Sequence, residues 1–231
     1  MFERALNDGV LQLHRPDTNW LSTAWDGGYV TADAAYNITV PDGWEQTDLD
    51  SYVATRLDRA GFEIEGPTLL TGVDQAHARG ARVGRTVAFA TCGLSNPSSL
   101  PMNPDDSMDV DEQPADLGTV NTVVGTDRSL DDGGLATLLI AAVEAKTATL
   151  LARTGFTGTT TDAVVVGCDP TGERVSFSGS ATAVGAEARA CVREAIRASL
   201  RSRYPDGGVP PSVEAAEHGV VTNRRATTFK P

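Results

Sequence analysis

The sequence predicts one α/β or α+β domain, residues 1–231, in which helices pack on a mixed β-sheet. The first observation is a series of Val-, Thr- and Tyr-rich stretches bounded by Asp, Asn and Gly, as expected of strands. The second is a set of longer stretches between and after them with apolar residues at helical spacing. The third is size, because 231 residues that are 40% hydrophobic can bury one core.

The N-terminal half opens with strands. The stretches LQLHRP, WLSTAW and GYVTADAAYNITVP are separated by turn residues, which predicts an antiparallel arrangement. Residues 49–60 have helical spacing and stop at Gly61. A strand is expected from Thr68 (TLLTGV), a turn or short helix over residues 73–80, and a buried strand from Arg85 (RTVAFATCG).

The C-terminal half alternates strands and helices. GTVNTVVGTD, from Gly118, is expected as a strand and residues 132–153 as a helix. TDAVVVGCD is continuously apolar, as in a strand covered on both faces. A turn over residues 169–172 then leads to RVSFSG, the expected hairpin partner. Residues 184–204 predict an amphipathic helix that packs on the sheet.

Two segments lack the pattern of a packed element. Residues 95–117 hold four prolines and six acidic residues, so we expect a long acidic loop. Such a loop is either a functional lid or a solvated insertion, and the strands on both sides of it argue against a domain boundary. The tail, residues 205–231, contains Pro210 and Pro211 and many charges, and is expected to be loosely ordered.

The charge balance bounds the partners. Nineteen basic and 31 acidic residues give a net charge of −12, which disfavours nucleic acid and acidic membranes. Lys146 and Lys230 are the two lysines, and many acids with few lysines are typical of halophilic proteins. High-GC codon usage would explain the missing lysines but not the added acids. No apolar stretch reaches the roughly 18 residues of a membrane helix, and the N-terminus carries acids, so a soluble cytoplasmic protein is expected.

Metal and cofactor motifs are missing from the sequence. Cys92, Cys168 and Cys191 are odd in number and far apart, which predicts neither disulfides nor a zinc site and fits a reducing compartment. No HExxH, GxGxxG, GxxxxGK or EF-hand pattern occurs, so no metal and no cofactor is expected. Of the histidines, His77 alone follows a strand end and is a candidate acid or base.

The helix over residues 132–153 contains two internal charges, Glu144 and Lys146. Its apolar residues wrap most of the circumference, which predicts burial on several sides. The two charges are two residues apart, so they point in roughly opposite directions and each needs its own partner. Either one borders an active site, or Lys146 extends to the rim and Glu144 caps a neighbouring backbone group.

Three polar segments could carry chemistry. TCGLSNP ends a strand with Ser95 and Asn96, which either contact a ligand or form an ordinary turn. TGFTGTTTDA offers threonine hydroxyls and Asp162, which is either a general base or a structural acceptor. WDGG places Trp25 beside glycines, where it either stacks on a ligand or marks a hairpin turn.

Five segments resemble, in order and spacing, the signature series of the adenosylcobinamide amidohydrolases of archaeal corrinoid salvage. They are LSTAWDGGYVTADAAYN, TCGLSN, GTVNTVV, EAKTATL and TGTTTDAVVV, from Trp20 to Val166. Each is weak alone, and the five together are specific. The chain departs from the family pattern at Asp26, where the family favours Asn, and at Cys92, where it favours Ala, which counts against Cys92 as a nucleophile.

The resemblance implies hydrolysis of the amide that joins aminopropanol to the corrin f side chain, converting adenosylcobinamide to adenosylcobyric acid for cobalamin biosynthesis. Such a reaction needs a base and stabilisation of an oxyanion. We expect Glu144 or Asp162 as the base and Lys146 or Asn121 as the oxyanion partner. The residues expected to bind substrate are Trp25, Asn37, Ser95, Asn96, Asn121 and Thr159.

Two other functions fit the same residues. One is a corrinoid-binding protein without catalysis, and the other is an amidase for an unrelated small amide. A protein that only binds the corrinoid would tolerate loss of Glu144. Comparing cobinamide with simple amides as substrates would distinguish an amidase for cobinamide from an amidase for another small amide. A small-molecule corrinoid is the expected partner, and whether the chain forms a homo-oligomer is left open.

Overall fold

The computed structural model describes residues 2–41, 43–44, 48–104, 119–216 and 218–231. Within them the chain forms three α-helices, one 3-10 helix and eleven strands. The helices are α1 (Leu49–Arg59), η1 (Gln75–His77), α2 (Asp132–Thr154) and α3 (Ala183–Arg203). The strands are β1 (Glu3–Asn7), β2 (Val10–Ser22), β3 (Gly28–Thr39), β4 (Thr68–Thr71), β5 (Arg79–Val83), β6 (Thr86–Cys92), β7 (Pro97–Ser99), β8 (Val120–Ser129), β9 (Gly158–Thr159), β10 (Ala163–Arg174) and β11 (Val220–Val221).

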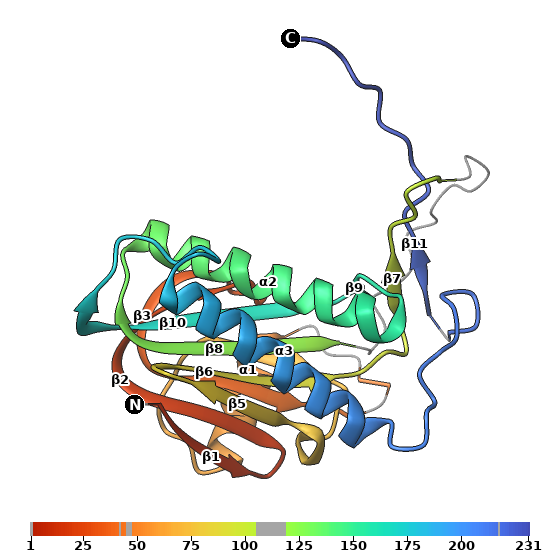
Figure 1. Cartoon of the computed structure of the whole chain (residues 1–231). Coiled ribbons are helices and arrows are strands. Elements are labelled where there is room, and N and C mark those ends of the chain that lie inside the picture. The colour runs from red at the N-terminus through yellow and green to blue at the C-terminus, as the bar shows by residue number, and fades with distance from the viewer. Residues whose placement is uncertain (1, 42, 45–47, 105–118, 217) are drawn as a thin grey trace.

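Most strands belong to one mixed sheet, which confirms the predicted fold class. Its order is β4-β3-β2-β10-β8-β6-β5, with β1 paired to β2. The parallel pairs β8–β10 and β3–β4 are each joined through a helix, α2 and α1 respectively, as a parallel connection requires. The antiparallel opening of the sequence is confirmed by β1, β2 and β3. A second, three-stranded sheet has the order β11-β7-β9 and lies beyond one end of the large sheet (Figure 1).

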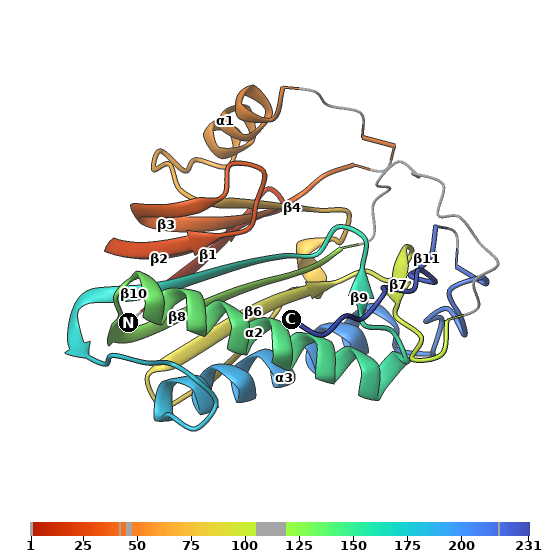
Figure 2. The same ribbon diagram turned by 90° about the horizontal axis from the view of Figure 1, so that it is seen from above.

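The large sheet folds over on itself, so the molecule has four layers (Figure 2). Strands β1 to β4 form one tier and β10, β8, β6 and β5 form the other. Helix α1 covers the outer side of the first tier, whereas α2 and α3 cover the outer side of the second (Figure 2). Each of the three interfaces holds a hydrophobic cluster. Representative members are Leu138 and Ile196 under α2 and α3, Trp20 and Val123 between the tiers, and Tyr36 and Leu57 under α1.

The helix boundaries follow from local side-chain chemistry. Asp131 caps the start of α2 by accepting a hydrogen bond from the Gly134 N–H, and Thr182 does the same for α3 through Gly185. Helix α2 ends at Gly155, whose φ of 80° is favourable for glycine and costly for other residues. These signals explain why α2 begins and ends, and why α3 begins, within one or two residues of the sequence prediction.

Helix α2 is, among the described residues, the one helix long and apolar enough to cross a membrane by length and composition. It packs along the second tier beside α3, with Leu135, Leu138 and Leu150 buried in the core. A core helix of a soluble protein can have the same composition, and one face of α2 packs in this way.

One strand prediction was wrong. Residues 169–172 do not turn back into a hairpin, because β10 continues to Arg174 alongside β8 with a register shift between Cys168 and Glu173. Asp169 accepts hydrogen bonds from the Thr171 N–H and hydroxyl, so the turn-forming residues make a local irregularity within the strand. RVSFSG therefore contributes no hairpin partner, and Val175 onward leads to α3.

The structure also contains strands that the sequence did not predict. Strands β1 and β5 are separate elements, and β2 is one long strand where two short ones were expected. Within the predicted acidic loop, Pro97–Ser99 forms β7, and within the predicted loose tail, Val220–Val221 forms β11. The acidic part of that loop, residues 105–118, lies outside the described residues.

Candidate active site

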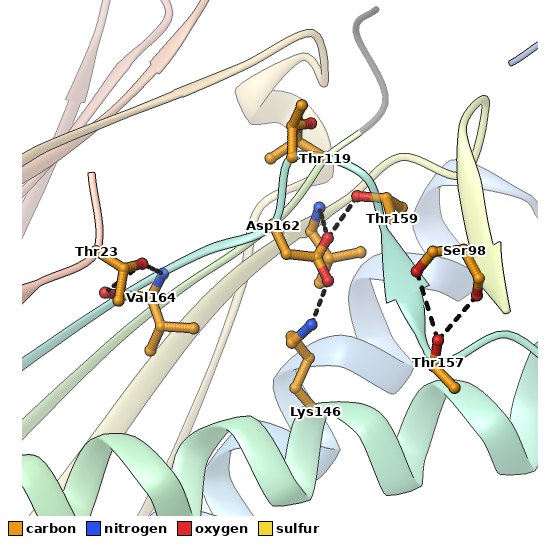
Figure 3. A network of polar contacts seen from close by, with 10 residues as sticks. Thr23, Ser98, Thr119, Lys146, Thr157, Thr159, Asp162 and Val164 are labelled. Atoms are coloured by element: carbon orange, nitrogen blue, oxygen red, sulfur yellow. Dashed lines mark hydrogen bonds and ion pairs between the residues drawn. The ribbon is translucent and has the colours of Figure 1, made fainter. Parts of the chain in front are cut away.

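A buried ion pair lies where β8 and β10 begin. Lys146 extends from α2, and its Nζ donates to Oδ2 of Asp162, the residue directly before β10 (Figure 3). The two side chains are only 7% and 13% exposed. Removing one partner of such a pair costs about 3–5 kcal/mol, because the other charge stays buried alone. Two candidates from separate parts of the sequence are therefore brought together.

Two further donors fix the Asp162 carboxylate. Its Oδ1 accepts from the backbone N–H of Val120 at 3.0 Å and from the hydroxyl of Thr159 (Figure 3). The carboxylate is thus held by α2, β8 and β9 at once. In this arrangement the carboxylate can act as a general base and take a proton from the hydroxyl that donates to it.

Close backbone approach is needed at Gly158. A Cβ added there would lie 2.4 Å from Oδ2 of Asp162 and 3.1 Å from Nζ of Lys146. The first distance is shorter than real Cβ contacts allow, so a side chain at this position would displace the carboxylate. Glycine therefore lets β9 lie against the ion pair.

A row of polar groups borders the pair. The hydroxyls of Thr119 and Thr161 are 2.7 Å apart, and the side-chain amide of Asn96 donates to the hydroxyl of Thr160. The backbone N–H of Thr160 in turn donates to the Asn96 carbonyl at 3.2 Å. These bonds join the turn before β7 to the threonine segment. They continue the small sheet, in which Pro97 of β7 pairs with Thr159 of β9.

Ser95 lies beside the C-terminal segment. It is half-buried, and its carbonyl accepts from the His218 N–H at 3.1 Å. Its backbone therefore helps anchor the tail next to the small sheet, and its side chain remains a candidate for substrate contact.

A second polar cluster lies between the two tiers of the sheet. Asn121, on β8, donates through Nδ2 to Oδ1 of Asn37 at 2.9 Å and to the Leu70 carbonyl at 2.8 Å. Asn37 donates to the Thr91 hydroxyl at 3.0 Å. Since the Asn121 Nδ2 serves two acceptors, the orientation of its amide is fixed.

The Asn121 Oδ1 is left without a hydrogen-bond partner among the described residues, although the residue is 1% exposed. A buried acceptor of this kind is costly unless a ligand or water donates to it. Asn121 follows Val120, whose N–H holds Asp162. The unpaired oxygen and the ion pair therefore belong to the same end of β8, on opposite faces of the sheet.

Glu144 is not part of this cluster. It lies on the outward face of α2, where it pairs with Arg189 of α3, and its side chain is 56% exposed. The expectation that Glu144 and Lys146 point in opposite directions is confirmed, but the expectation that α2 is buried on several sides is wrong. Ile140 and Leu151, on the Glu144 face, are 56% and 46% exposed.

Trp25 lies in the connection between β2 and β3, as its glycines predict. Two residues earlier, Thr23 bonds to the backbone of Val164 at the start of β10 (Figure 3), so this loop borders the same end of the sheet. The Trp25 indole is 42% exposed and donates to Asp50 of α1 at 3.3 Å.

Two other candidates have structural surroundings. The His77 ring contacts the Ser202 hydroxyl at 3.1 Å, at the end of α3. Cys92 is fully buried, and burial raises the pKa of its thiol to about 12. The thiolate is the nucleophilic form, so Cys92 is not suited to attack an amide at neutral pH.

Sequence reasoning missed the roles of Gly158 and of the Val120 N–H. Gly158 stands in the TGTTTDA segment, directly before the threonines, and that position was the available signal. Backbone donors such as the Val120 N–H carry no residue-type signature, so only the fold could reveal that contact. Of the described residues, no group of three or more His, Cys, Asp or Glu side chains is arranged to hold a metal ion.

Comparison with known proteins identifies the family of this chain. The family model described as adenosylcobinamide amidohydrolase matches residues 2–207. A curated adenosylcobinamide amidohydrolase from Halobacterium salinarum is 56% identical over 233 residues, covering 100% of both chains. Another, from Methanosarcina mazei, is 27% identical over 197 residues, covering 81% of this chain and 92% of that protein.

Among solved structures, the PH0078 protein from Pyrococcus horikoshii OT3 has a TM-score of 0.45 at 11% identity, covering 87% of this chain and 79% of its own.

The chain is therefore an amidohydrolase, an enzyme that cleaves amide bonds with water. It belongs to the adenosylcobinamide amidohydrolase family, as the five segments of the sequence predicted. The acidic, lysine-poor composition of this chain is typical of a halophilic protein, and this agrees with its similarity to a protein from Halobacterium.

Proposed function

We propose that this enzyme hydrolyses the aminopropanol amide of adenosylcobinamide, releasing adenosylcobyric acid and free aminopropanol in cobalamin salvage in the cytoplasm. The observation that carries the proposal is the Lys146–Asp162 pair, which is buried where β8 and β10 begin and is bordered by hydroxyls. Family membership supports the reaction, and the geometry supports the assignment of roles to residues.

Asp162 is the general base in this proposal. It takes a proton from the attacking water, whose oxygen adds to the amide carbon. The Thr159 hydroxyl, bonded to the same carboxylate, positions that water and the substrate amide. When the C–N bond breaks, the protonated Asp162 returns the proton to the departing amine. The water oxygen remains on the new carboxylic acid, and one water proton leaves with the amine.

Lys146 stabilises the tetrahedral oxyanion. Its ammonium group is buried, where a fixed positive charge acts more strongly than it would in water. Asp162 holds the ammonium in position in the free enzyme. Glu144 has no role in this scheme, because it lies on the outward face of α2.

Asn121 contributes to substrate binding. The corrin ring carries a fringe of amides, and an N–H of that fringe is the proposed donor to the unpaired Oδ1, which is buried in the free protein and becomes accessible when substrate binds. Asn37, Ser95, Asn96 and Trp25 belong to the elements that meet at the same end of the sheet and complete the proposed substrate contacts.

The test is to incubate the purified protein with adenosylcobinamide in concentrated salt and to follow the corrinoid by mass spectrometry. Appearance of adenosylcobyric acid is the expected result. Lys146→Met and Asp162→Asn should each lower turnover by about 10². Lys230→Met replaces the other lysine, and Asp58→Asn an exposed aspartate of α1, as matched controls that should keep full turnover. An unchanged corrinoid with folded wild-type protein would favour binding without catalysis.

A further inference from the structure

Helix α2 presents an apolar stripe that the described residues leave open to solvent. Ile140, Val143 and Leu151 are 56%, 36% and 46% exposed. Together with Thr147 they follow helical spacing along one face. They line a shallow groove bordered by the ion pair between Glu144 and Arg189 of α3. Figure 1 shows α2 running along the upper edge of the layered part of the molecule.

This exposure conflicts with the composition of the helix. By length and composition α2 is apolar enough to cross a membrane, but only 44% of its most apolar stretch is buried within the protein. A helix that is apolar around most of its circumference is normally covered on most sides. The described residues do not cover the stripe, and an apolar surface of this kind marks a contact with a partner.

The distribution of charge points to what that partner is. Helices α2 and α3 together carry seven basic and four acidic residues, whereas the rest of the chain carries 12 basic and 27 acidic residues. The net negative charge of the chain therefore lies outside these two helices and opposes contact between two copies there. At the stripe each copy offers one charge of each sign, Glu144 and Arg189, so two copies can meet with opposite charges facing one another.

We propose that two copies of this chain associate through the stripe, with α2 packed against α2 across a two-fold axis. In such an isologous interface the same patch serves both copies. Glu144 of one copy then faces Arg189 of the second copy, and the apolar residues between them are covered. A membrane fits less well, because Glu144 in the middle of the stripe would lie against acyl chains.

The first test is the molar mass in concentrated KCl, measured by sedimentation over a range of protein concentrations. The wild type is expected to be a dimer. Ile140→Glu and Val143→Glu should each weaken association at least about 10-fold, since a charge would be buried in the contact. Leu6→Glu, at a residue 55% exposed on β1, is the matched control and should remain dimeric. Circular dichroism checks that each variant is folded.

The second test identifies the contact across the two-fold axis. Glu144→Arg alone and Arg189→Glu alone should each be monomeric, because each places like charges opposite one another. Mixing the two variants should restore a dimer that contains one copy of each. Neither a dimer formed elsewhere on the surface nor the intramolecular ion pair predicts this recovery on mixing.

Three outcomes would overturn the inference. The wild type could be monomeric at every concentration, or its dimer could be unaffected by Ile140→Glu. Alternatively, a monomeric wild type could bind vesicles of acidic archaeal-type lipid and lose that binding in Ile140→Glu, which would assign the stripe to a membrane. None of these results depends on whether the reaction proposed above is correct.

Discussion

Gly158 and Asp162 are so close that a single added carbon on the glycine would lie 2.4 Å from the carboxylate oxygen. Gly158→Ala should therefore displace Asp162 and with it Lys146. Because misplacing a reacting group by about 1 Å can cost about 10² in rate, kcat should fall by that order while the protein stays folded. Steady-state kinetics with a melting curve checks this. Gly155→Asn, at the positive-φ end of α2 with open space around it, is the control and should keep kcat.

The ion pair separates structural from catalytic contributions. Lys146→Met leaves Asp162 buried without its cation and should lower the free energy of unfolding by about 3–5 kcal/mol. The double variant Lys146→Met with Asp162→Leu removes both charges and should recover most of that stability, but no activity. Denaturant unfolding and turnover are the two measurements. Recovery of turnover in the double variant would show that the pair is purely structural.

Asn121 should act on substrate binding. Asn121→Ala removes the unpaired buried acceptor, so KM should rise by roughly 10-fold, the usual size of one lost hydrogen bond. The neighbouring Thr122 has a buried hydroxyl with no partner among the described residues. Thr122→Val, on the face of β8 that meets α2 and the ion pair, should raise stability slightly because it removes an unpaired buried hydroxyl. An unchanged KM in Asn121→Ala would contradict the assignment.

The free energy of unfolding should depend on pH through Asp169. The Arg15 guanidinium beside it, with Thr171, lowers the pKa of this carboxyl from 3.8 to about 2 in the folded protein. The ionised form thus stabilises the fold above about pH 4, and this contribution is lost as the pH falls toward about 2. Asp169→Asn should be less stable at neutral pH and should show a shallower loss of stability in that window. Thermal melts across the pH range test the difference.

Cys92 should be dispensable for chemistry. Since burial raises the pKa of its thiol to about 12, alkylating reagents should leave it unmodified in the native protein at neutral pH. Cys92→Ala should retain kcat. Loss of turnover without loss of folding would make the thiol a catalytic group.

The sequence predicted the elements whose pattern is local. Helix α3 has one apolar stripe, and β10 has a continuous apolar run between two neighbours, so both could be recognised. The strands β7 and β11 could not, because each is two or three residues long and exists only through pairing with a partner far along the chain. Asp169 was misread for a related reason, since its turn-forming bonds occur at an irregularity after which β10 resumes its pairing with β8.

The candidate site was recovered in part. Lys146 and Asp162 were chosen from separate segments, and the fold brings them together. Glu144 and Lys146 could not be distinguished by periodicity, because apolar residues surround both and only the packing of α2 shows which face meets the sheet. The Val120 N–H and Gly158 contribute through the backbone, to which residue type gives little guide.

The small sheet ties the last residues of the chain to the proposed site. Strand β11 pairs with β7, β7 pairs with β9, and β9 carries Gly158 and Thr159 against Asp162. Residues 97–99, 158–159 and 220–221 thus meet in one sheet, with β11 as an outer strand. Proteolysis between α3 and β11 would spare every strand of the large sheet and would still loosen the support behind β9.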